Sequence, residues 1–166
     1  MINNETIKTI KSNTWTGELD LCSKLAPVCK YKCCKFASNY IVLYPGEREA
    51  AGKCLDHLEI IDSDYFGGQK AHCKQQCNPA VDYKPLDCRS YPFFPQVTLD
   101  KISGLLKGKK CPADGQSASN HALKTIEVWN DLINDNLQIV EWLTHVRLVG
   151  YEPYYQHQTP PTRPRF

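Results

Sequence analysis

The clearest hydrophobic pattern in the chain is an apolar stripe within residues 117–149. Its apolar residues recur at steps of three and four positions, which is the spacing of one buried helix face. They are Ala122, Ile126, Trp129, Ile133, Leu137, Val140 and Leu143. The polar run 134–136 interrupts the stripe, so one long helix and two helices joined there both fit the sequence. Gly150 and Pro153 end the helical pattern.

Two short apolar runs upstream predict β-strands. Residues 40–44 are β-branched or aromatic, and residues 58–62 form a similar run. Between these runs, Pro45 stands where a short helix can begin and Gly52 where it would end. The alternation therefore predicts a strand, a short helix and a second strand.

The segment 69–95 is rich in proline and predicts an irregular loop, because proline interrupts regular backbone hydrogen bonding. After it, residues 96–99 and 102–106 predict a small hairpin. Residues 153–166 predict a flexible proline-rich tail. We therefore expect a single α+β domain over residues 1–152. It would be a small irregular cysteine-rich metal-binding module, with short strands packed on one or two C-terminal helices.

Composition narrows the class of partner. The chain has 166 residues, of which 42% are hydrophobic and 23% charged, enough for a folded core. Its net charge of +2 gives no reason to expect nucleic acid or a membrane surface as partner. No apolar run approaches the ~20 residues of a membrane span. The N-terminus also lacks a secretory signal pattern, so the sequence predicts the cytoplasm, where thiols stay reduced.

Cysteines carry most of the chemical information. Cys29, Cys33 and Cys34 form a C-x3-C-C block, and Cys73 and Cys77 form a second pair some forty residues later. Thiols grouped in separate blocks suit a soft metal ion or an iron–sulfur cluster. Zinc takes four Cys or His ligands and a [4Fe–4S] cluster takes four thiolates, so spacing alone leaves zinc, iron and a cluster open.

Other cysteine chemistries remain as alternatives. The chain has nine cysteines, an odd number, and the vicinal pair Cys33–Cys34 is too close along the backbone for an ordinary mutual disulfide. A disulfide-stapled secreted protein is therefore a weaker hypothesis than metal binding, and inert buried thiols are a third. The thiols and imidazoles are numerous enough for two metal sites. The further candidate ligands are Cys22, Cys54, Cys111 and His72.

A third cysteine-containing motif, Lys84-Pro85-Leu86-Asp87-Cys88-Arg89-Ser90-Tyr91-Pro92-Phe93, is the most specific signal in the chain. Together with C-x3-C-C and the Leu43-Tyr44-Pro45-Gly46-Glu47 step, it resembles the CxxCxxCC family, small bacterial proteins described as zinc- or iron-chelating domains. The resemblance covers residues 29–94. It implies the metal ligands Cys29, Cys33, Cys34, Cys73, Cys77 and Cys88. The first block departs from the family pattern, with three residues where the family has two and Lys32 at the usual glycine.

The same resemblance raises an enzymatic alternative. A flagellin lysine methylase looks like a distant, similarly cysteine-rich relative with an implied iron–sulfur cluster, so a redox or methyl-transfer enzyme or enzyme component is the second hypothesis. No nucleophile elbow, phosphate-binding loop, dinucleotide fingerprint or zinc-protease motif is present, and no catalytic residue is selected. Arg89 follows the expected ligand Cys88 and is a candidate cofactor-binding residue that would offset thiolate charge; a surface ion pair is the alternative.

Overall fold

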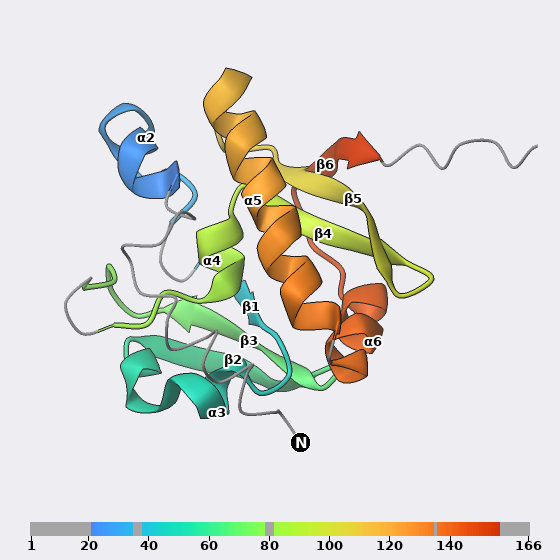
Figure 1. Cartoon of the computed structure of the whole chain (residues 1–166). Helices are drawn as coiled ribbons and strands as arrows, with labels where there is room; N and C mark the ends of the chain where they lie inside the picture. The colour runs from blue at the N-terminus through green and yellow to red at the C-terminus, as the bar shows by residue number, and fades with distance from the viewer. Residues whose placement is uncertain (1–20, 35–37, 79–81, 135, 157–166) are drawn as a thin grey trace, which may run out of the picture.

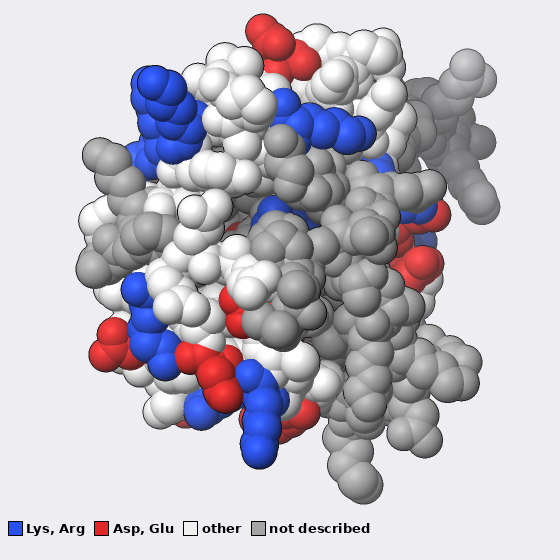
Figure 2. Space-filling view, turned by 90° about the vertical axis from the view of Figure 1, so that its left-hand side faces the viewer, with Lys and Arg blue, Asp and Glu red and all other residues white. Residues whose placement is uncertain are grey.

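The computed structural model describes residues 21–34, 38–78, 82–134 and 136–156. Two three-stranded antiparallel sheets and several helices make up this part of the chain (Figure 1). The predicted α+β class is therefore confirmed. On the face in Figure 2, positive and negative side chains are interspersed among uncharged ones.

The first sheet has the order β1-β3-β2, from β1 (Ile41–Leu43), β2 (Leu58–Tyr65) and β3 (Gly68–Cys73). Between β1 and β2 the chain forms the helix α3 (Glu47–Ala51) and the 3₁₀ turn η1 (Gly52–Leu55). Gly52 ends α3 with a positive φ of 58°, which glycine adopts without a steric penalty. The two strands and the short helix predicted here are confirmed.

The second sheet has the order β4-β5-β6, from β4 (Phe93–Thr98), β5 (Lys101–Gly108) and β6 (Tyr151–Gln156). The predicted hairpin is confirmed, and it turns through Leu99 and Asp100, both with positive φ. β6 pairs with β5 as far as Gln156, so ordered structure continues four residues beyond the predicted domain boundary. The rest of the predicted tail lies outside the described residues.

The apolar stripe forms two helices, α5 (Gly115–Asn134) and α6 (Leu137–His145), so the two-helix alternative is the one adopted. Asn136 separates them and its side-chain amide donates to the Leu132 carbonyl at 2.8 Å. Both helices pack on β4. Trp129 of α5 stacks on Trp142 of α6 with ring centroids 6.5 Å apart, and both contact Phe94 in the core.

The predicted irregular loop 69–95 is the main error of the sequence analysis. It contains β3, the short helix α4 (Leu86–Ser90) and the start of β4. β3 is a largely polar strand that pairs on both sides, so its strand geometry comes from neighbours distant in sequence. α4 contacts β1, β4 and α5, and so lies at the junction of both sheets and the long helix (Figure 1).

Candidate metal centre

Eight cysteines reach the region around α4 from five separate parts of the chain. The helix α2 (Leu21–Cys29) was not predicted, and it carries two of them almost two turns apart on one face. The others come from the turn after α2, from β3 and its following segment, from α4, and from the turn after β5. These eight are Cys22, Cys29, Cys33, Cys34, Cys73, Cys77, Cys88 and Cys111.

Cys73 is the centre of the first set of thiols. The Cys73 thiol donates a hydrogen bond to Cys77, and negative charge on Cys88, Cys77 and Cys34 acts on it. The hydrogen bond, burial and these charges together raise the pKa of Cys73. We call Cys34, Cys73, Cys77 and Cys88 the first thiol group.

Cys77 is the thiol of this group most readily ionised. The hydrogen bond from Cys73 lowers its pKa, burial opposes the change, and the neighbouring His57 and Lys84 lower it further, to about 5. Burial raises the pKa of Cys88 strongly, whereas the charge of Lys84 acts in the opposite direction. A thiolate and a thiol therefore lie side by side near neutral pH.

His57 is the imidazole next to the first thiol group. Its side chain is 1% exposed, and its Nδ1 lies 3.5 Å from the Asp82 carboxylate. Burial alone would lower its pKa, but the neighbouring Cys77 and the Asp82 charge outweigh burial and raise it. From the sequence, His72 was named only as a possible substitute ligand. His72 precedes Cys73 directly on β3, so the two side chains point to opposite faces of the sheet.

Two largely buried basic residues lie at α4, Lys84 just before the helix and Arg89 within it. Lys84, only 9% exposed, places its charge on Cys77 and Cys88. Arg89, the predicted cofactor-binding residue, is 3% exposed, and its charge acts on Tyr44 and Tyr83. Lys84 thus fulfils toward these thiols the charge-offsetting role that the sequence suggested for Arg89.

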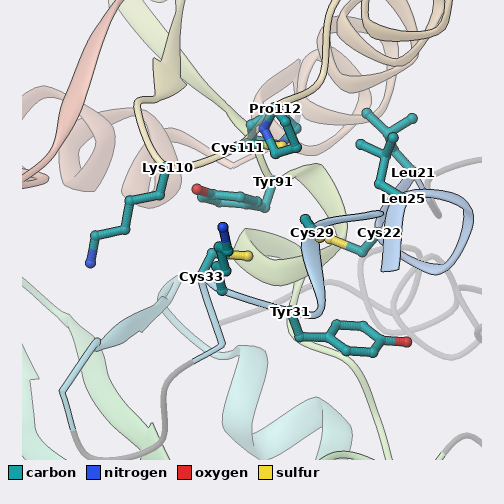
Figure 3. Close-up of a pocket in the computed structure, with 12 residues that line it drawn as sticks. Leu21, Cys22, Leu25, Cys29, Tyr31, Cys33, Tyr91, Lys110, Cys111 and Pro112 are labelled. Atoms are coloured by element: carbon teal, nitrogen blue, oxygen red, sulfur yellow. The ribbon is translucent and has the colours of Figure 1, made fainter. Parts of the chain in front are cut away.

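The remaining four thiols line one pocket, shown in Figure 3, and we call them the second thiol group. They are Cys22, Cys29, Cys33 and Cys111. Tyr91 lies between the Cys33 and Cys111 sides of the pocket. Burial raises its pKa, and negative charge on Cys33, Cys111 and Cys22 adds to the effect. Of these thiols, the resemblance had implied Cys29 and Cys33 as ligands together with the first group.

The two groups meet at the vicinal pair. Cys33 and Cys34 share a side-chain hydrogen bond, which together with burial raises the pKa of Cys33. Yet Cys34 acts on Cys73, whereas Cys33 lines the pocket with Cys111. Consecutive residues therefore face different groups; the sequence had left open whether the six expected ligands form one site or two.

The thiols are neighbours, but their side chains are not arranged as the ligands of a metal ion. Within the described ranges, no three Cys, His, Asp or Glu side chains converge closely enough to hold a metal ion. All nine cysteines fall in those ranges, and none of them forms a disulfide. Metal binding would therefore require the thiols to rotate toward one another and to release protons.

Comparisons with known proteins add no assignment: no family model, curated protein or solved structure matches the chain. Within the part that the structure describes, no helix combines the length and apolar character needed to cross a membrane. The thiols and their surroundings are therefore the basis for inferring a function.

Proposed function

We propose that this protein binds zinc or iron, as an ion or in an iron–sulfur cluster, through clustered cysteine thiolates. One observation carries the proposal: Cys73 interacts with three other thiols that come from separate segments of the chain. Four thiolates are the full ligand set of a structural zinc ion or a [4Fe–4S] cluster. Inert buried thiols have no reason to gather in this way.

The surroundings of the first thiol group support the same function. Several thiolates around a metal carry net negative charge, and a buried site needs positive groups nearby to offset it. Lys84 supplies one such charge, and His57 supplies another when protonated. His57 is also placed to serve as a ligand in place of one thiolate.

The resemblance to the CxxCxxCC proteins supports metal chelation independently of the geometry, through the C-x3-C-C block and the motif around Cys88. The site itself names no reaction. The proposed role is therefore retention of the metal by this fold, with zinc, iron and a cluster as the three occupants that an experiment separates.

Protein purified without oxygen provides the test, by elemental analysis together with a visible absorption spectrum. We expect stoichiometric zinc or iron. Brown colour with acid-labile sulfide identifies a cluster, and colourless protein with zinc identifies an ion site. Absence of both metals at stoichiometric level contradicts the proposal.

A pair of variants localises the metal to the first thiol group. Cys77→Ser removes the thiol that is most readily ionised, and we expect it to lose metal from that group. Cys54→Ser is the matched control, because Cys54 is exposed on η1 and belongs to neither thiol group. Equal metal content in both variants argues against the first group as a ligand set.

A further inference from the structure

The second thiol group lines a pocket of its own. Its members come from α2, from the turn that follows α2 and from the turn after β5 (Figure 3). These segments are separated by up to about ninety positions between Cys22 and Cys111, so the sequence alone gives no sign that they meet. From the sequence, Cys111 was expected only as a possible substitute ligand. In the structure it forms part of the pocket wall.

The side-chain donors of the pocket, apart from the hydroxyls of Tyr31 and Tyr91, are soft thiols. Its described lining contains four thiols but no carboxylate and no imidazole. Hard cations such as Mg²⁺ and Ca²⁺ require oxygen ligands, whereas zinc, ferrous iron and cuprous copper accept thiolates. The enclosed space is about 10 Å³, the size of one water-sized body, which suits a single ion.

Positive charge is available at the rim. Lys32 and Lys110 both line the pocket, where they can offset the charge of several thiolates. The Lys110 ammonium donates to the Asn39 side-chain oxygen at 3.0 Å, which holds it at the outer edge of the pocket (Figure 3), and the charge of Lys107 also acts on Cys111. The Tyr91 ring lies between Cys33 and Cys111 in the pocket.

Eight thiolates exceed the four that one tetrahedral ion accepts. They can be divided into two adjacent sets of four, with Cys34 beside Cys73 and Cys33 in the pocket, and the sets are close enough for the charge of Cys22 to act on Cys88. We propose that Cys22, Cys29, Cys33 and Cys111 bind a second thiophilic metal ion, separate from the one assigned to the first thiol group. This inference rests on the proposed metal-binding function but concerns a different ligand set.

The experiment counts metal per chain in the full-length wild type and in single variants, prepared identically without oxygen. Cys111→Ser and Cys22→Ser remove ligands of the second group, Cys77→Ser removes one of the first, and Cys54→Ser is the control. Circular dichroism checks that each variant remains folded. Cobalt loading of each variant reports the remaining thiolate ligands through their charge-transfer absorption.

We expect two metal equivalents in the wild type and the control. Cys111→Ser and Cys22→Ser should each lose the same equivalent, and Cys77→Ser should lose the other. A metal that is lost in Cys77→Ser but fully retained in both second-group variants overturns the second site while leaving the proposed function intact. Metal-free wild-type protein, with no cobalt–thiolate absorption after loading, overturns both.

Discussion

At the scale of single residues, Glu47 is the least expected side chain. Glutamate is seldom buried, but this side chain is fully buried. One oxygen accepts hydrogen bonds from the Tyr83 hydroxyl at 2.9 Å and the Leu86 amide at 2.7 Å. The other accepts from the Tyr44 amide at 3.1 Å. Glu47 thus joins α3 to the start of α4.

Glu47 should also make stability depend on pH. Burial penalises the charged form and raises its pKa from 4.5 to about 7, although its hydrogen bonds oppose the change. Because the folded pKa exceeds the unfolded one, the contribution of Glu47 is fully present below pH 4.5 and is lost as the pH rises to 7. The change is on the order of 3 kcal/mol.

We predict that Glu47→Gln flattens the decline in unfolding free energy between about pH 4.5 and 7, measured by urea denaturation. Glu49→Gln is the control, because Glu49 lies exposed on the same helix. Burial raises the pKa of Asp87 to about 6, so Asp87 should maintain part of the pH dependence of stability in both variants. An unchanged pH dependence in Glu47→Gln would contradict the assignment.

At the scale of elements, α4 is the piece on which the first thiol group depends. A helix of five residues is unstable alone, so tertiary hydrogen bonds must hold it. The Val42 amide donates to the Asp87 carboxylate at 2.9 Å, and the Trp129 indole donates to the Ser90 hydroxyl at 2.9 Å. Cys88 lies between these two anchors.

Ser90→Ala should destabilise the protein, because it leaves the buried indole N–H of Trp129 without its acceptor. The expected cost is roughly 1–3 kcal/mol. Ser63→Ala, at an exposed position of β2, should change stability by less than ~0.5 kcal/mol. Thermal unfolding of both variants checks this, and equal midpoints would show that the Trp129 bond contributes nothing.

The elements found by sequence analysis are those with a strong local pattern. The hairpin through Leu99 and Asp100 and the paired helices both follow from local spacing of apolar residues. β3 and α4 were missed because a polar strand and a one-turn helix are defined by distant partners. α2 was missed because its Pro27 and its cysteines obscure a helical pattern.

At the scale of the whole molecule, the sequence predicted that thiols matter but not how the fold groups them. Six predicted thiols do lie in the region around α4, but the chain path assigns them to two groups. Cys22 and Cys111 complete the second group through the packing of α2 and a turn far along the chain. That pairing, like the position of His57 beside Cys77, depends on tertiary structure and leaves no local signal.

If the protein holds metal as proposed, removing the metal should loosen the thiol-bearing segments before the helical core. Chelation is expected to raise hydrogen exchange at 29–34 and 73–78, where few strand or helix hydrogen bonds hold the chain. α5 should remain protected, because Trp129 and its neighbours are buried against β4. Mass spectrometry of exchanged peptides measures this, and uniform deprotection on chelation would contradict it.

Cys54 gives the molecule a built-in standard for chemical labelling. It is exposed on η1, away from the pocket thiols, so an alkylating reagent should reach it at the same rate with or without bound metal. Its labelling half-time can then calibrate the slower thiols within a single sample. The number of cysteines whose labelling speeds up relative to that of Cys54 after chelation would give the count of metal-protected sulfurs, with no spectrum of the metal required.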